Sequence, residues 1–262
     1  MQPKFEQLAR ALADAWRTCA TIPLPDAEAA PHSRNEAFII QDRMSEILGD
    51  KCVGWKVGAA VRAVQILEGH DGPITGRLFA PGLVTSPAQV PAMYDGYKIE
   101  CEFAFRFTQD VAPRTKPHTR AELEPQLVLH PGLELAGTRY ATSAGSRKVT
   151  THDAIADNGT GGGYIVGAGI ADWRSIDLAR LPIDARIDGG AAIETYTGEY
   201  RRDPVDILVE TVNGLSGRGI GLASGDLLST GSLTVPTPLR SGQTYVARFG
   251  DLLTLSASMR SR

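Results

Sequence analysis

The segment from Tyr97 to Phe107 constrains the fold more than any other part of the chain. Large apolar residues or cysteine occupy every second position, while lysine, arginine, alanine and two glutamates occupy the positions between them. This period of two predicts a β-strand with one face fully buried in a core. The other face then carries Glu100 and Glu102 side by side, roughly 7 Å apart along the strand.

The rest of the sequence predicts an N-terminal region of helices that is followed by a region rich in strands. Apolar residues between Phe5 and Trp16 recur at helical spacing, and a second helix follows, with a capping box at Ser33 and Glu36 and its end at Gly49. We therefore predict an α+β fold with a helical region at residues 1–50 and a β-rich catalytic body at residues 51–262, acting as a single functional unit. The other predicted strand runs include Cys52–Val57, Leu78–Val84, Tyr164–Val166 and Tyr245–Leu255.

Composition excludes several classes of partner. The chain has 262 residues, 42 % of them apolar, which can supply a sizeable core. Its net charge of -3 provides no cationic field for nucleic acid or an anionic membrane surface, so neither is an expected partner. No apolar run approaches the roughly 20 residues that cross a bilayer. Three widely spaced cysteines suggest no disulfide framework, so we expect a reducing, cytoplasmic location.

The paired glutamates predict a metal site. Two like charges on a partly buried sheet face repel each other unless a cation lies between them, and carboxylate oxygens suit magnesium, manganese or calcium better than zinc. Glu134 stands alone in the apolar run from Leu133 to Ala136, where burial without a partner would cost several kcal/mol. A third metal ligand would explain it. The alternative for all three glutamates is a solvent-facing position on a strand.

A set of short motifs occurs in a fixed order between residues 38 and 256. They are Gly54-Trp55-Lys56-Val57-Gly58, Gln65, Pro73, Gly76, Leu78-Phe79, Ile99-Glu100-Cys101-Glu102, Leu133-Glu134, Ala156-Asp157-Asn158, Gly225-Asp226 and Thr230-Gly231. The ordered set resembles the 2-keto-4-pentenoate hydratase family, within the fumarylacetoacetate hydrolase superfamily. The 4-oxalocrotonate decarboxylases share the same framework.

This resemblance implies a fold, a cofactor and a substrate class. The implied fold is a mixed β-roll, like the C-terminal domain of fumarylacetoacetate hydrolase, with flanking helices. The family's three acidic ligands for Mg²⁺ or Mn²⁺ fall on Glu100, Glu102 and Glu134. The implied substrate is a small 2-keto or enol acid, and the implied assembly is a homo-oligomer.

The resemblance also implies roles for residues around the metal. We expect Lys56 and Asp157 to be catalytic: burial near a metal should lower the pKa of Lys56, which would move or stabilise a proton, and Asp157 would orient Lys56 or a water molecule. The expected substrate-binding residues are Gln65, Asn158, Thr160, Thr230 and Gly231. For Asp157 and Asn158, a turn or helix end that satisfies backbone groups is an equal alternative.

Four functions are compatible with the sequence. The leading prediction is a hydro-lyase that adds water to a 2-hydroxy-dienoate, giving a 4-hydroxy-2-keto acid. The alternatives are decarboxylation of a 2-oxo-enedioate, hydrolysis of a C–C bond in an acylpyruvate-like substrate, and a non-catalytic scaffold partner of a pathway enzyme. The scaffold alternative stays open because Ile74 occupies a position where many hydratases carry an acidic residue.

Overall fold

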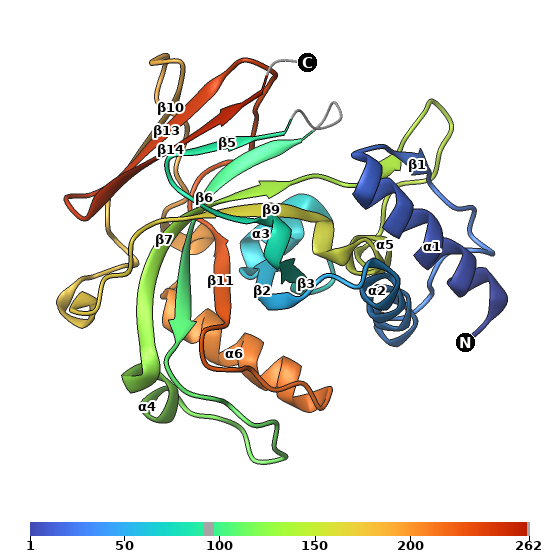
Figure 1. Cartoon of the computed structure of the whole chain (residues 1–262), viewed down its shortest axis with the longest axis horizontal. Coiled ribbons are helices and arrows are strands. Elements are labelled where there is room, and N and C mark those ends of the chain that lie inside the picture. Colours follow the sequence, from blue (N-terminus) through green and yellow to red (C-terminus); the bar gives the residue numbers. More distant parts are fainter. Residues whose placement is uncertain (92–96, 261–262) are drawn as a thin grey trace.

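A curled mixed β-sheet forms the centre of the molecule in a computed structural model that describes residues 1–91 and 97–260 (Figure 1). Its main path has the strand order β3-β2-β11-β6-β7-β9-β4, and β12 adds to it by pairing with β6. These strands are β2 (Cys52–Gly58), β3 (Ile74–Phe79), β4 (Leu83–Thr85), β6 (Lys98–Phe107), β7 (Leu127–Ala136), β9 (Gly161–Val166), β11 (Leu227–Ser232) and β12 (Thr237–Pro238).

A second sheet packs over one face of the first. It has the order β10-β13-β14-β5, and a short parallel pair, β1 and β8, lies apart from both sheets. The apolar residues of β6 enter the core beneath the second sheet, where the ring of Phe103 lies 5.9 Å from that of Phe249. The bounds are β1 (Ile22–Pro23), β5 (Ala88–Val90), β8 (Tyr140–Ala141), β10 (Ile183–Ile187), β13 (Thr244–Phe249) and β14 (Leu253–Met259).

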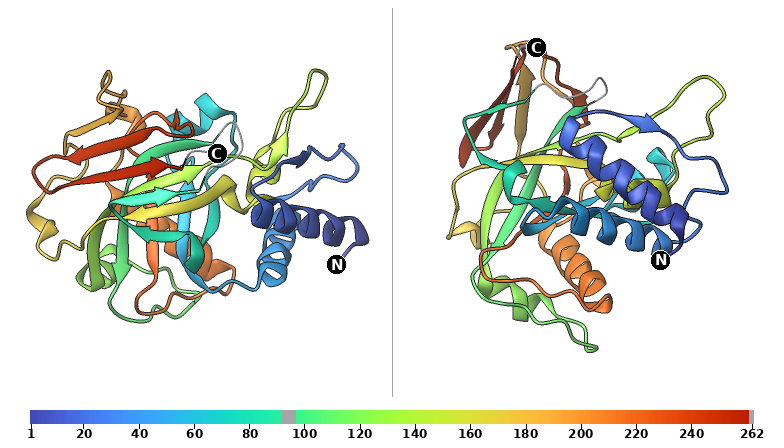
Figure 2. Two further views of the ribbon diagram at one scale, coloured as in Figure 1. Left: turned by 45° about the horizontal axis from the view of Figure 1, so that its top comes forward. Right: turned by 45° about the vertical axis from the view of Figure 1, so that its right-hand side comes forward.

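The helices cover other parts of the central sheet. The N-terminal helices α1 (Pro3–Thr18) and α2 (Arg34–Leu48) pack on each other, and α2 packs on α5 (Thr151–Ala156), at the end of the molecule far from the second sheet (Figure 2). The Ser33 hydroxyl accepts from the backbone N–H of Glu36, which confirms Ser33 as the cap, whereas the Glu36 carboxylate accepts from the backbone N–H of His32 instead of completing the predicted capping box. Gly49 ends the helix with a φ of 69°. The helices are α1 (Pro3–Thr18), α2 (Arg34–Leu48), α3 (Arg62–Glu68), α4 (Arg120–Leu123), α5 (Thr151–Ala156) and α6 (Pro204–Gly217).

The predicted α+β class and mixed roll are confirmed, whereas several strand boundaries differ. The run predicted from Leu78 to Val84 is two strands, β3 and β4, because Pro81 interrupts it in a short 3-10 turn. The run predicted from Tyr245 to Leu255 is likewise a hairpin of β13 and β14, which turns at Gly250 with a φ of 50°. In the described residues, no helix is long and apolar enough to cross a membrane.

The division of the chain at residue 50 stays a prediction. The two N-terminal helices bury Leu12 and Ile40 in a core that also contains Phe79 and Ile155 from beyond that boundary. The helical region therefore shares its packing with the β-rich body.

Candidate functional site

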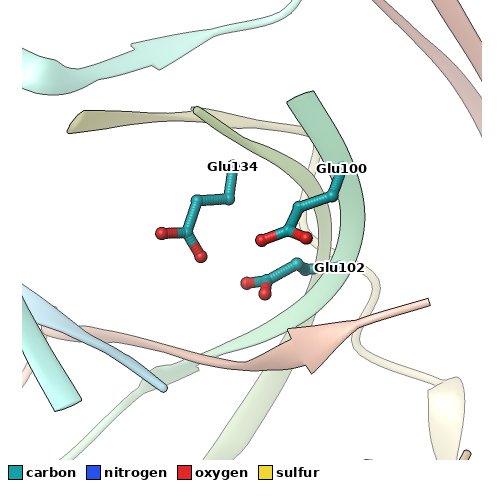
Figure 3. A group of neighbouring side chains, drawn as sticks. All are labelled: Glu100, Glu102 and Glu134. Carbon is teal, nitrogen blue, oxygen red and sulfur yellow. The ribbon is translucent and has the colours of Figure 1, made fainter. Parts of the chain in front are cut away.

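Three glutamates converge on one point beside the central sheet (Figure 3). In the antiparallel ladder of β6 and β7, Glu100 lies directly opposite Glu134, and Glu102 follows two residues later on the same face. One carboxylate oxygen from each residue lies within 4.8 Å of the others. Oxygen ligands lie about 2.0–2.6 Å from Mg²⁺ or Ca²⁺, so one ion can bridge atoms spaced by roughly 4–5 Å.

The three carboxylates are buried, which makes their charges costly. Glu102 and Glu134 are 0 % and 1 % exposed, and neither oxygen of Glu102 has a hydrogen-bond partner among the described residues. Burial, followed by the charge of Glu134, raises the pKa of Glu100 to about 8, and the same two causes raise the pKa of Glu102 well above its usual value. Either protons or a cation must therefore compensate this cluster, and a carboxylate set of this kind fits a hard divalent ion.

Lys56 reaches the same cluster from β2. Its Nζ lies 3.0 Å from Glu134 Oε1, and its side chain is 2 % exposed. Burial by itself lowers the pKa of Lys56, but the nearby carboxylates, Glu134 first, together raise it above its ordinary value. From the sequence, we expect a lowered pKa for Lys56, so the raised pKa is the opposite of that expectation. The expectation assumed a bound metal ion, whose positive charge would offset the carboxylates.

A cavity of about 370 Å³ reaches the cluster at Glu100, while Glu102 and Glu134 are not among its lining residues. Among the predicted site residues, its lining includes Lys56, Glu100, Thr160, Thr230 and Gly231. The Thr230 hydroxyl donates to the carbonyl of Phe103 at 2.9 Å, which ties β11 to β6. Gly231 has a φ of 90°, and a Cβ there would lie 3.3 Å from Ala60 Cβ, so glycine keeps this wall of the cavity open.

Two residues predicted to bind substrate lie outside the cavity lining and stabilise its walls instead. Gln65 donates from Nε2 to the carbonyl of Ala59, which has a positive φ of 49°. Asn158 accepts from the backbone N–H of Arg77 and donates to its carbonyl, so it binds the edge of β3 as a neighbouring strand would. For Asn158 the structure therefore agrees with the alternative in which the side chain satisfies backbone groups.

Asp157 also has partners other than the expected Lys56. The Asp157 carboxylate forms a buried ion pair with the guanidinium of Arg139, and it accepts from the Arg139 backbone N–H and from the Thr138 hydroxyl. Arg139 in turn donates to the carbonyl of Gly161 at 3.0 Å. A Cβ on Gly161 would lie 3.1 Å from Lys56 Cε, so the ion pair supports the wall behind the lysine. Asp157 is therefore linked to the surroundings of Lys56 through Arg139 and the Gly161 backbone.

Several lining residues were missed in the sequence. His70 and Glu68 border the cavity from the region of α3, and the remaining ones come from the segment between β10 and α6. The only signal for that segment was its mixture of tyrosine and arginine, which has no fixed spacing to predict a site. These lining residues are Tyr196, Tyr200, Arg201 and Arg202.

Known proteins with sequences similar to this chain include hydratases and decarboxylases. No family model matches the chain. It is 25 % identical to a 2-keto-4-pentenoate hydratase of Burkholderia vietnamiensis over 228 residues, covering 84 % of this chain and 82 % of that protein. It is 26 % identical to a 4-oxalocrotonate decarboxylase of a Pseudomonas species over 214 residues, covering 80 % of this chain and 79 % of the relative.

A solved structure agrees over nearly the full length. The 4-oxalocrotonate decarboxylase from Pseudomonas putida G7, complexed with magnesium and adipate, has a TM-score of 0.84 at 21 % identity, covering 99 % of this chain and 98 % of that one. The fold is therefore that of this decarboxylase. In sequence, the chain is similar to enzymes named as 2-keto-4-pentenoate hydratases and 4-oxalocrotonate decarboxylases.

Proposed function

We propose that this protein is a divalent-metal-dependent hydro-lyase that adds water to a 2-hydroxy-dienoate and yields a 4-hydroxy-2-keto acid. The observation that carries this proposal is the convergence of three buried carboxylates, one of which, Glu100, lines a cavity that Lys56 also borders. The relatives named as hydratases support the reaction type. The cavity volume of about 370 Å³ accommodates a small acid.

In this proposal, Glu100, Glu102 and Glu134 hold Mg²⁺ or Mn²⁺. When bound, the ion would supply Lewis acidity that stabilises negative charge on the substrate's 2-oxygen. Lys56 holds a proton close to that charge through its ion pair with Glu134. Thr160, Thr230 and Gly231 shape the wall against which the substrate binds.

The direct test is incubation of the protein and Mg²⁺ with 2-hydroxypenta-2,4-dienoate. We expect the dienol absorbance to disappear and the product mass to correspond to addition of one water molecule. EDTA should abolish the reaction. An unchanged dienol in the presence of bound metal would contradict the proposal.

Decarboxylation of a 2-oxo-enedioate is the second candidate. The observation that favours it is the set of cationic side chains, Lys98, Arg201 and Arg202, on the lining of the same cavity, because a dicarboxylate carries a second anionic group. Release of carbon dioxide from such a substrate, with no hydration of the dienol, would favour this candidate. Inertness towards both substrates would favour a scaffold role.

We also propose a homo-oligomeric, cytoplasmic protein. The three cysteines, all in the described part of the chain, form no disulfide, in keeping with a reducing compartment. Light scattering coupled to size-exclusion chromatography tests the oligomeric state, and a mass of about 28 kDa in solution would contradict it.

A further inference from the structure

His70 lies at the rim of the cavity, in the turn between α3 and β3. Its side chain is 15 % exposed, and it is the one imidazole among the lining residues in the described part of the chain. Histidine is the side chain whose ordinary pKa suits proton transfer near neutral pH. The leading reaction requires a proton to leave the attacking water, and the residues discussed above supply no group for that step.

The contacts of His70 hold its ring in a defined orientation. Nδ1 lies 3.2 Å from the Thr151 hydroxyl, which also accepts from the backbone N–H of Asp71. In the tautomer in which Nδ1–H donates to Thr151, Nε2 is the basic nitrogen. Nε2 lies 3.8 Å from Glu68 Oε2, so a proton taken up there would face a carboxylate.

His70 and Lys56 serve different parts of the same cavity. The side chains of Ile74 and Lys56 both lie next to Gly58. A hypothetical Cβ atom on Gly58 would lie 3.0 Å from Ile74 Cγ1 and 3.4 Å from Lys56 Nζ. The apolar Ile74 side chain therefore borders the lysine amine. Ile74 has no proton to transfer. The cavity thus has two proton carriers, Lys56 beside the carboxylate cluster and His70 at the rim. The apolar Ile74 side chain lies close to Lys56.

We propose that His70 is the general base that deprotonates the water added to the substrate, and that the Glu68 carboxylate stabilises the imidazolium that forms when Nε2 takes the proton. This inference depends on the hydro-lyase function proposed above. The 2-hydroxy-dienoate first ketonises to a 2-oxo-3-enoate, losing the proton of its 2-hydroxyl to solvent and gaining one from solvent at C5. As the water oxygen then bonds to C4, the C3–C4 π electrons shift towards the 2-oxygen, and Nε2 takes one water proton. Lys56 then protonates C3 and restores the 2-oxo group, and solvent carries the proton from His70 back to Lys56.

Burial favours a neutral His70 ring. Burial lowers the pKa of His70 below 6.5, and the positive charges of Lys56 and Arg34 act in the same direction, while Glu68 and Asp71 raise it. Asp71 is itself paired with Arg34 and faces His152 of α5 at 3.8 Å. A base with a lowered pKa remains unprotonated at neutral pH and loses activity only on acidification.

The test compares kcat and its pH profile in three variants with the wild type. His70→Gln should lower kcat by about 100-fold or more, the usual contribution of a general base, and should remove the acidic limb of the profile. Glu68→Gln should move that limb to lower pH, because it removes a charge that favours the imidazolium. His152→Gln, the matched control, alters an imidazole outside the cavity lining and should leave kcat unchanged. Circular dichroism and Mg²⁺ binding monitor the fold of each variant.

The outcomes distinguish this inference from the proposed function. If the wild type hydrates the dienol and His70→Gln retains kcat within about threefold with its acidic limb intact, His70 is not the base. If His70→Gln does not fold, the Glu68→Gln profile decides, and an unshifted limb overturns the inference. A wild type that leaves the dienol unchanged removes the proposed function itself.

Discussion

Replacing Glu102 with glutamine tests the metal site most directly. Two unit charges 4.8 Å apart repel by about 3 kcal/mol at an effective dielectric constant of about 20. This repulsion adds to burial and raises the pKa of Glu102 well above its usual value, so loss of the metal favours the protonated acid. Glutamine is nearly isosteric with the protonated acid. We therefore expect Glu102→Gln to change the free energy of unfolding in EDTA by less than about 1 kcal/mol.

Magnesium should stabilise the wild type against unfolding more than it stabilises Glu102→Gln. At a concentration 100 times the wild-type Kd, binding stabilises the folded state by about 2.7 kcal/mol, which raises Tm by roughly 5–10 °C. If loss of the ligand weakens affinity by about 100-fold, the variant gains only about 0.4 kcal/mol at the same concentration. Activity should be lost together with this stabilisation.

The assay is urea and thermal unfolding at pH 7, with EDTA or with Mg²⁺. Glu28→Gln, which alters an exposed acid remote from the cluster in sequence, is the control and should behave as the wild type. Equal stabilisation of Glu102→Gln and wild type by Mg²⁺ would refute the ligand assignment. A large loss of stability in EDTA would refute the assigned protonation state.

Three further substitutions test other parts of the site. Lys56→Met should retain Mg²⁺ binding in calorimetry but slow turnover by about 100-fold or more, and an unchanged kcat would count against proton transfer by the lysine. Asp157→Asn removes the charge that pairs with Arg139 in the core and should lower the free energy of unfolding by about 3 kcal/mol or more in urea, whereas a near-neutral effect would contradict its structural role. Gly132→Ala would bring a Cβ to 2.2 Å from the Tyr164 ring and should destabilise the protein by about 1–3 kcal/mol, and a wild-type Tm would contradict this packing.

The described structure gives two of the predicted site residues partners that the sequence did not indicate. Asn158 and Asp157 resemble pocket residues in the sequence, yet their side chains are occupied by Arg77 and Arg139, which lie 81 and 18 residues away along the chain. His70 shows the opposite case, because nothing in its local sequence indicates that the turn after α3 borders the cavity. Hydrogen-bond partners and cavity walls are set by contacts between distant segments, which local patterns do not encode.

The strand at residues 98–107 was evident from the sequence itself, because its period of two reflects backbone geometry and a buried core. The same period put Glu100 and Glu102 on one face. Only the tertiary structure decided that Glu134 would face them, since this depends on the register of β6 against β7, and that β2 would bring Lys56 within 3.0 Å of Glu134. Local periodicity fixes which face a side chain occupies, whereas the pairing of distant strands determines which charges meet.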